Sequence, residues 1–411
     1  MKESEIWQTK NGLRVCYVEK AKFHKSYVGI GVNYGSRDLK FLLNGKEYTS
    51  LEGTAHFIEH KLFQMPYGDA FMEFSKLNAV ANAYTDLEKT LYYFTTTDDL
   101  YAPLKLLLEM YFTPYFIEKD VEKEKGIITS EIKMYDDVIE SRFSRKILKQ
   151  LYPKSSLSSN VAGTIRSVNQ TTAEDLRNAY DAFYTTDNSY LVIVSHEPRE
   201  KVYQFVEEVM SKCSVNRGLP NRGKEQIPQS IGSSFQMKSK AEQTTASLAI
   251  RFSANQDSHL FCNFIIGLLD SIFSPSTKYY KKLSDKKLFI ADIDYYVMTL
   301  RDTSYAILST TSNYAKEFLR EVQEKLVNLS LKDLDEDSLK LYLKHLKARS
   351  IRALDSVEEL GEEVLVLALE NASYLDELEE SQALEIEDFY KYVEYFNTGL
   401  YIQAICEKSE K

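Results

Sequence analysis

The chain has 411 residues, of which 44% are hydrophobic and 27% are charged, and its formal net charge is −10. This length exceeds that of one ordinary domain, so we expect two domains of about 200 residues each. The acidic balance argues against a nucleic-acid partner, because contacts with phosphates need a basic surface.

The sequence predicts neither a membrane span nor a signal peptide. No apolar run approaches the roughly 20 residues that cross a bilayer, and the polar stretch 1–10 lacks the apolar core of a signal peptide. The four cysteines are widely separated and show no C-x-x-C spacing, which is typical of free thiols in a reducing compartment. We therefore expect a soluble, cytoplasmic protein with no membrane partner.

The first half of the chain reads as a mixture of strands and helices. Alternating, β-branched and aromatic runs predict strands at 13–19, 25–34, 80–85, 90–97 and 189–195. Amphipathic periodicity predicts helices at 100–111, 118–135, 139–151 and 172–183, besides one that includes residues 56–60. Residues 36–50 are predicted as a polar connection with a turn at Asn44-Gly45.

A short motif, HFIEH at residues 56–60, stands at the centre of this half. On a helix, His56 and His60 lie on one face about one turn apart, so both imidazoles can reach a single ion. Two neutral imidazoles suit Zn²⁺, and the intervening Glu59 is placed to accept a proton from the attacking water. The order H-x-x-E-H is typical of inverzincin metallopeptidases; a helical histidine pair without a metal is the alternative.

Zinc held by two histidines needs a third protein ligand. The acidic helix at 118–137 offers several carboxylates, and Glu124 and Glu131 share a face because they are seven residues apart. We expect Ile127, Ile128 and Ile132 to pack this helix into the protein. Spacing alone does not choose Glu131 over Glu124 or Glu122.

The pattern of the first half begins again after a predicted linker at 214–234, which is rich in Gly, Pro, Asn, Arg and Ser. Strands are predicted at 245–252, 288–297, 304–311 and 400–405, with helices at 261–273 and 276–283 and helical periodicity over 314–395. Glu174, Asp175, Phe183 and Thr185 recur 213 residues later as Glu387, Asp388, Phe396 and Thr398. Two similar α+β halves follow, a metal-binding catalytic domain at 1–213 and a related domain at 235–411. Where the first half has HFIEH, the second has IGLLD at 266–270, without a metal-binding residue pair.

These features together resemble the pitrilysin or insulinase family, which includes the mitochondrial processing peptidases and half-size bacterial relatives. The resemblance is carried by HFIEH, by NAYT at 82–85, by the run at 121–137 and by the two-half plan. It covers most of the chain and is strongest over residues 50–195. It implies a fold in which each half is a mostly antiparallel sheet covered by helices, the two forming one jaw of a clamshell.

The resemblance also implies roles for single residues. Glu131, 71 residues after His60, corresponds to the third zinc ligand, and Glu124 to an acidic residue that supports the ligands. Asn82, Ala83, Tyr84 and Thr85 correspond to a sheet edge to which a peptide substrate adds as a strand. The implied activity is that of a zinc-dependent endopeptidase with Glu59 as general base.

The sequence departs from the family pattern at one place, and this departure affects the expected partner subunit. Family members carry an Arg and, seven residues on, a Tyr in the second half, and these positions fall here on Ser284 and Ala291. Neither side chain can replace them, although Tyr279, Tyr280 or Arg301 could compensate. We therefore expect a heterodimer with a related subunit that lacks HxxEH but supplies the Arg/Tyr pair; a homodimer is also open. A catalytically silent scaffold, or a maturation peptidase for a bacteriocin-like or otherwise modified peptide precursor, are the alternative functions.

Overall fold

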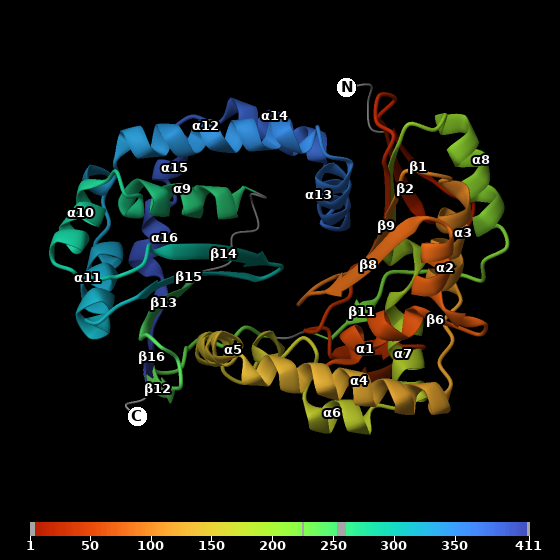
Figure 1. The fold of residues 1–411 in the computed structure, drawn as a ribbon, viewed down its shortest axis with the longest axis horizontal. Helices are drawn as coiled ribbons and strands as arrows, with labels where there is room; N and C mark the ends of the chain where they lie inside the picture. The colour runs from red at the N-terminus through yellow and green to blue at the C-terminus, as the bar shows by residue number, and fades with distance from the viewer. Residues whose placement is uncertain (1–4, 224–225, 253–259, 409–411) are drawn as a thin grey trace. The chain divides into compact units, whose positions relative to one another are not determined.

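The computed structural model describes residues 5–223, 226–252 and 260–408 (Figure 1). The chain forms two compact units, each assembled from three segments of sequence. The first unit comprises 1–135, 159–225 and 352–374, and the second comprises 136–158, 226–351 and 375–411. Both mix α-helices with β-sheets, as the sequence predicts.

The first unit contains a six-stranded sheet of order β1-β2-β10-β3-β9-β8. Its strands are β1 (Glu5–Gln8), β2 (Arg14–Glu19), β3 (Ser26–Val32), β8 (Ala79–Thr85), β9 (Thr90–Thr96) and β10 (Ser189–Ser195). All neighbouring strands are antiparallel except β2 and β10, which are parallel. β8 is thus an edge strand, with one side open to a further strand.

Helices accompany this sheet. They are α1 (Thr54–Leu62), α2 (Ala70–Lys76), α3 (Tyr101–Phe112), α4 (Glu118–Asp137), α6 (Ile165–Gln170), α7 (Ala173–Phe183), α8 (Arg199–Met210) and α13 (Val357–Leu369), with a short 3-10 turn at Thr186–Asn188. The 3-10 turn at Ser156–Ser158 belongs to the second unit. Thr164 and Thr172 cap α6 and α7 through reciprocal capping boxes, which satisfy backbone donors at those ends.

The second unit repeats the plan of the first. Its five-stranded sheet has the order β12-β16-β13-β15-β14, with a parallel pair, β12 and β16, at the place of β2 and β10. The strands are β12 (Phe235–Ser239), β13 (Thr245–Phe252), β14 (Asp294–Leu300), β15 (Thr303–Thr311) and β16 (Leu400–Lys408). The helices are α5 (Ile139–Leu151), α9 (Phe261–Phe273), α10 (Lys278–Asp285), α11 (Ala315–Val327), α12 (Glu336–Ala353), α14 (Tyr374–Ala383), α15 (Glu387–Tyr390) and α16 (Val393–Thr398), with a 3-10 turn at Leu331–Asp333. With β1 left aside, the strands of the two sheets have the same order and directions, in agreement with a sequence that repeats after 213 residues.

The compact units and the repeated halves of the sequence differ in two helices. α5 belongs to the first half of the sequence but contacts β13 and β16 of the second unit, whereas α13 belongs to the second half but packs on β3 and β10 of the first unit. Gly29, Gly31 and Gly361 permit this second contact, because a Cβ at Gly29 or Gly31 would meet a leucine side chain of α13 within 3 Å and one at Gly361 would meet the Tyr27 ring.

The predicted linker at 214–234 is only in part a free connection. Its first residues belong to the first unit, where β11 (Asn221–Arg222) pairs with β4 (Lys40–Leu43). Thr185 also donates to the Gly218 carbonyl at 2.6 Å. Within the same predicted linker, Lys224 and Glu225 lie outside the described residues.

Two local predictions need correction. Residues 36–50, predicted as a polar connection, contain the hairpin β4 and β5 (Lys46–Thr49), whose turn is formed by Asn44 and Gly45 with positive φ angles of 52° and 77°. The strand predicted at 288–297 begins only at Asp294, because Leu288 is bound by the backbone to the end of α10. No helix among the described ranges is both long and apolar enough to span a bilayer.

Candidate metal centre

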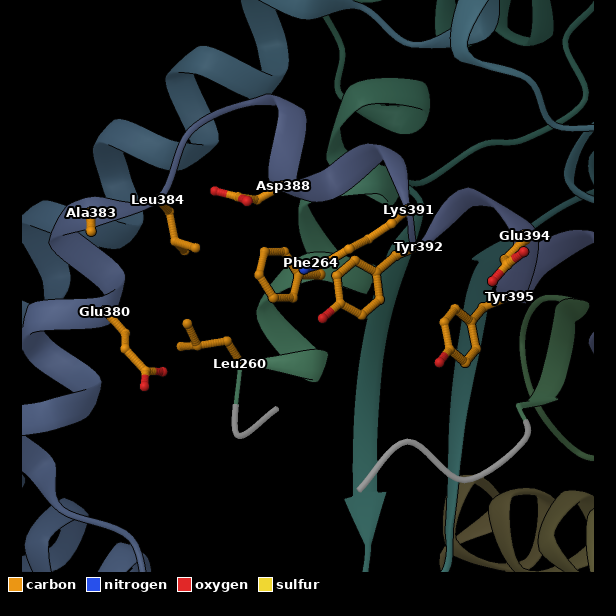
Figure 2. A pocket seen from close by; sticks show the side chains of 10 residues that line it. All are labelled: Leu260, Phe264, Glu380, Ala383, Leu384, Asp388, Lys391, Tyr392, Glu394 and Tyr395. Carbon is orange, nitrogen blue, oxygen red and sulfur yellow. The ribbon is translucent and has the colours of Figure 1, made fainter. Parts of the chain in front are cut away.

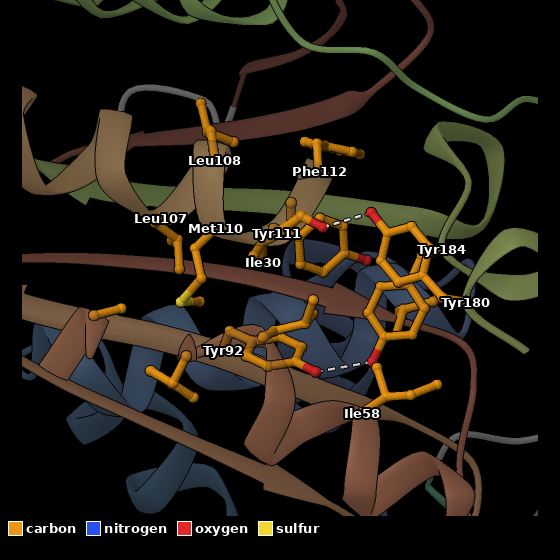
Figure 3. Packing of buried hydrophobic residues seen from close by; sticks show 14 of the residues in the cluster. Ile30, Ile58, Tyr92, Leu107, Leu108, Met110, Tyr111, Phe112, Tyr180 and Tyr184 are labelled. Atoms are coloured by element: carbon orange, nitrogen blue, oxygen red, sulfur yellow. Dashed lines mark hydrogen bonds between the residues drawn. The ribbon is translucent and has the colours of Figure 1, made fainter. Parts of the chain in front are cut away.

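The metal-motif helix α1 is anchored by its apolar face. Phe57, Ile58 and Leu62 are buried in the main core of the first unit, while Glu59 and His60 are only partly covered. This core is rich in tyrosines whose hydroxyls are satisfied: Tyr92 and Tyr184 share a hydrogen bond of 2.8 Å (Figure 3). Because Ile58 packs into this cluster, the rotation of α1 about its axis is fixed, and with it the direction of the motif side chains.

The start of α1 depends on two glycines. Gly53 caps the helix with φ of +89°, and Gly163 approaches it with φ of +78°. A Cβ on Gly53 would lie 2.5 Å from the Ala162 carbonyl, and one on Gly163 would lie 2.3 Å from the Glu52 carbonyl. Both the conformation and the close approach of the two chain segments therefore require glycine.

Three side chains from two distant helices converge beside α1. His56, His60 and Glu131 each offer a ligand atom, and these atoms all lie within 4.8 Å of one another. Glu131 Oε2 of α4 is 3.7 Å from His56 Nε2 and 3.5 Å from His60 Nε2. Across residues 5–223, 226–252 and 260–408, no other group of at least three His, Cys, Asp or Glu residues meets this separation.

Glu124 lies behind His60. Its Oε1 is 3.0 Å from His60 Nδ1. Since an ionised carboxylate can only accept, Nδ1 carries the proton, and Nε2 is the atom that His60 directs toward Glu131. The third acid considered from the sequence, Glu122, is largely exposed and pairs with Lys125 of its own helix.

The same helix face explains why Glu131 reaches the imidazoles. Val121, Lys125, Ile128 and Ile132 of α4 are buried, and Glu124 and Glu131 lie at the margin of that buried face. The prediction that Ile127 packs into the protein is wrong, because its side chain is 57% exposed. Ile127 and Ile128 are neighbours in the chain, and the periodicity of the sequence did not show that only Ile128 faces the core.

Glu59 points to a different partner. Its Oε2 accepts a hydrogen bond of 2.7 Å from the hydroxyl of Thr85, the last residue of β8. Burial raises the pKa of the Glu59 carboxyl, and the Thr85 hydrogen bond opposes that rise. The carboxylate is thus held beside the histidines without contributing an atom to the three-residue cluster.

The pKa values of the two imidazoles are shifted in opposite directions. Burial, reinforced by the charge of His60, lowers the pKa of His56 to about 4. For His60, burial also disfavours the charge, but hydrogen bonds to Glu124 and Glu131 outweigh it and raise the pKa to about 9. The pKa of Glu131 is lowered, chiefly by His60. In the absence of a metal, the charged His60 imidazole therefore has one N–H for each carboxylate, with Nδ1–H toward Glu124 and Nε2–H toward Glu131.

The donor set fits a zinc ion. Ligand atoms about 2.0–2.1 Å from a tetrahedral zinc lie roughly 3.3 Å apart, and the carboxylate–imidazole separations here are 3.5 and 3.7 Å. His60, whose Nδ1 is hydrogen-bonded to Glu124, has the orientation usual for a metal-binding histidine. His56 Nδ1 is buried with no hydrogen-bond partner in the described part of the chain, so its ring relies on packing.

The four residues predicted to bind substrate lie at the open edge of the sheet. Asn82, Ala83, Tyr84 and Thr85 end β8, which contacts α1. The Ala83 N–H donates to the Asn82 side chain at 2.9 Å. Hydrogen-bonded pairs alternate in an antiparallel ladder, and the Asp86 N–H donates to the Lys89 carbonyl, so the Ala83 N–H faces away from β9 and toward the open edge. The Tyr84 ring packs against the cluster beneath α13.

The second unit holds the residues considered as replacements for Arg and Tyr. The Tyr279 hydroxyl donates to the Glu321 carbonyl, and the Tyr280 hydroxyl donates to Asp292 at 2.6 Å. Arg301 also has an interaction partner. Ser284 and Ala291 are exposed. Both tyrosines are thus engaged within their own unit.

A pocket in the second unit is lined by residues of that unit alone (Figure 2). Its floor is the stacked pair Phe264 and Tyr392, with centroids 4.2 Å apart. Lys391 already lies 5.3 Å from the Tyr392 centroid, so the aromatic surface has a cation of its own. The pocket has no His or Cys among its lining residues, and we place the candidate centre at His56, His60 and Glu131 instead.

The architecture is that of a two-unit α+β protein whose described residues form one candidate metal centre, in the first unit. Consistent with this, the family model of insulinase, peptidase family M16, matches residues 14–165. The model of the peptidase M16 inactive domain matches residues 170–346. The chain belongs to the M16 peptidase family.

Relatives agree with this assignment. YmfH of Bacillus subtilis (strain 168), named an uncharacterized zinc protease, is 39% identical over 204 residues, which are 49% of this chain and 48% of the relative. The chain spans about half the length of the curated relatives it matches first. The crystal structure of an M16-like peptidase from Alicyclobacillus acidocaldarius has a TM-score of 0.91 at 25% identity, covering 99% of this chain and 98% of that one. The periplasmic protease PqqL of Escherichia coli shares the fold at a TM-score of 0.76 and 15% identity; the match covers 98% of this chain but 48% of PqqL.

Proposed function

We propose that this protein is a zinc-dependent endopeptidase that hydrolyses peptides. The observation that carries the proposal is the convergence of His56, His60 and Glu131, with Glu131 Oε2 within 3.7 Å of both imidazoles. The zinc-protease names of its relatives and its M16 membership support the same chemistry.

Zinc bound by these three residues would polarise the scissile carbonyl and lower the pKa of water. Glu59 then accepts the proton of the attacking water and returns it to the leaving amine. Thr85 orients the Glu59 carboxylate through its 2.7 Å hydrogen bond. Glu124 keeps the His60 proton on Nδ1 and so leaves Nε2 free to bind the metal.

The substrate is proposed to add as a strand to β8. An edge strand presents unpaired backbone groups to which an extended peptide can pair, and β8 ends at the residue that hydrogen bonds Glu59. Backbone pairing would hold a peptide in extended form beside the general base with little dependence on its sequence.

We further propose that the active enzyme contains a second, related chain in the cytoplasm. The match to PqqL covers nearly all of this chain but only 48% of that protease, so the fold corresponds to half of a longer one. Within the second unit, Tyr279 and Tyr280 are engaged with Glu321 and Asp292, and Ser284 and Ala291 cannot supply the expected substrate contacts. A heterodimer partner that lacks HxxEH is favoured, and a homodimer is the alternative.

The test combines metal analysis with Glu59→Gln. The wild-type protein should bind one zinc per chain and cleave quenched-fluorescent peptides, alone or with its co-purifying partner, and a chelator should abolish cleavage. Glu59→Gln should keep its zinc and lose about 10²–10⁴-fold in kcat. Glu122→Gln, an exposed acid on α4, is the matched control and should keep full activity. Retained zinc without chelator-sensitive cleavage in any assembly would instead favour a catalytically silent subunit.

A further inference from the structure

Two aliphatic side chains on α4 stand exposed beside the metal cluster. Ile127 and Met134 are each 57% exposed, although neighbouring aliphatic residues of the same helix, Ile128 and Ile132, are buried. Large aliphatic side chains in water carry an unfavourable hydration free energy, which a contacting apolar group removes. We call Ile127 and Met134 the α4 shelf.

The α4 shelf lies on the open side of Glu131. At about 100° per residue, Ile127 and Met134 are rotated by about 40° and 60° to one side of Glu131, while Ile128 and Ile132 are about 60° and 100° to the other side. On the second side Ile128 and Ile132 are buried in the core. Because Glu131 directs its carboxylate at both imidazoles, the shelf borders the side of the cluster that solvent and substrate can reach.

The two shelf residues bracket Glu131 along the helix. Side chains three and four residues apart on a helix are neighbours, with Cβ atoms about 5–6 Å apart. A peptide bond placed at the cluster therefore has its flanking side chains within reach of Ile127 or Met134. Of the other exposed residues nearby, Ser130 and Lys133 are rotated from Glu131 by about 100° or more around the helix, whereas Tyr135, which is 45% exposed, is rotated by about 40° to the side of Ile128 and Ile132.

Resting on the proposed function, we propose that the α4 shelf is a specificity surface that selects peptides with an aliphatic side chain next to the scissile bond. The edge of β8 pairs with backbone and is indifferent to sequence, so selection has to come from side-chain contacts. An aliphatic side chain on the shelf buries apolar area on both partners, whereas a charged or amide side chain would be desolvated there without a hydrogen-bond partner on the shelf. The occupant is the substrate itself.

The test uses a peptide library digested from a cell lysate and mass spectrometry of the cleavage products. The wild-type protein, with its partner if one is needed, should cleave next to Leu, Ile, Val or Met several-fold more often than chance. The double variant Ile127→Gln/Met134→Gln keeps size and neutrality but removes the apolar surface. Its preference should vanish, and kcat/KM for a Leu-containing peptide relative to its Asn counterpart should fall about tenfold or more.

Two variants serve as controls. Ser130→Gln places the same amide on another side of α4 and should keep the wild-type preference, as should Ile127→Leu/Met134→Leu. Unchanged zinc content and thermal unfolding of the Gln double variant exclude a folding defect. Equal preference in the wild type and the Gln double variant, with chelator-sensitive cleavage intact, overturns the specificity surface alone. Absence of chelator-sensitive cleavage in the wild type overturns the proposed function and this inference with it.

Discussion

Thr85 and Glu59 are joined by a hydrogen bond of 2.7 Å between the last residue of the edge strand β8 and the carboxylate inside the HFIEH motif. This bond connects the strand proposed to bind a peptide with the residue proposed to act as general base. The two residues are 26 apart in sequence, and in the proposed mechanism the same contact would set both the position of the substrate and the orientation of the base.

Thr85→Val should move the acid limb of the pH–activity profile. Burial raises the pKa of Glu59 and the Thr85 hydroxyl lowers it, so removing the hydroxyl raises it further. Because a general base must be ionised, activity should fall off at a higher pH than in the wild type, with kcat at neutral pH several-fold lower. Steady-state kinetics across pH 5–9 measures the shift. Thr85→Ser keeps the hydroxyl and should leave the limb in place; an unmoved limb in Thr85→Val contradicts the proposed role.

Glu124→Gln should weaken zinc binding by about 10–100-fold. The carboxylate fixes His60 through the 3.0 Å contact with Nδ1, and an amide holds that proton less strongly. Competition with a chromophoric chelator measures the affinity. Glu122→Gln, on the same helix and largely exposed, should bind zinc as the wild type does. Equal affinities in the two variants would show that Glu124 does not support the centre.

Zinc binding should release close to one proton at pH 7. The pKa of His60 is raised to about 9, so its imidazole is charged at pH 7 and must lose a proton to bind metal. The pKa of His56 is lowered to about 4, so it contributes none. The affinity of the protein for zinc should therefore rise with pH until about pH 9. Calorimetry in buffers of different ionisation enthalpy counts the protons, and release of none or of two contradicts this assignment.

The raised pKa of His60 also predicts how the free energy of unfolding of the metal-free protein depends on pH. The pKa of His60 in the folded state, about 9, is above the unfolded value near 6.5. The stabilisation it gives is therefore complete below pH ~6.5 and is lost as pH rises through ~9. Chemical denaturation of the metal-free wild type and of Glu124→Gln across this window measures the effect. The variant, which lacks the strongest partner of His60, should show a smaller loss.

Ala83→Pro should raise KM with little effect on zinc content. The Ala83 N–H bonds to the adjacent Asn82 side chain and not to β9, so proline removes a donor from the open edge without breaking the sheet. A peptide added to β8 would lose one backbone hydrogen bond, worth several-fold in KM. Ala83→Val keeps the N–H and is the control. An unchanged KM in Ala83→Pro would place the substrate elsewhere than this edge.

Much of the fold follows from patterns that are local in sequence. The strand at 245–252 and the helix at 261–273 have the predicted bounds, because continuous apolar runs and helical periodicity reflect burial of one element against its sheet. The hairpin of β4 and β5 escaped prediction, since half of its strand residues are polar and β4 pairs with β11, a strand that is distant in sequence. No local pattern in the sequence predicted that α5 packs on the sheet of the second unit or that α13 packs on the sheet of the first.

The sequence by itself determined the placing of His56 and His60 on one face, because helical periodicity alone brings side chains four residues apart together; the rings lie 4.6 Å from each other. It also determined the two-fold repetition of the chain. The residue pattern by itself left the third carboxylate open among Glu122, Glu124 and Glu131, which share one helix and one chemistry, and only the resemblance pointed to Glu131. The tertiary structure separates them for two physical reasons. The rotation of α4, fixed by the burial of Val121, Ile128 and Ile132 against the core, turns Glu122 into solvent. Glu124 and Glu131 share a face but lie two turns apart along the helix axis, so Glu131 reaches both imidazoles and Glu124 reaches Nδ1 of His60.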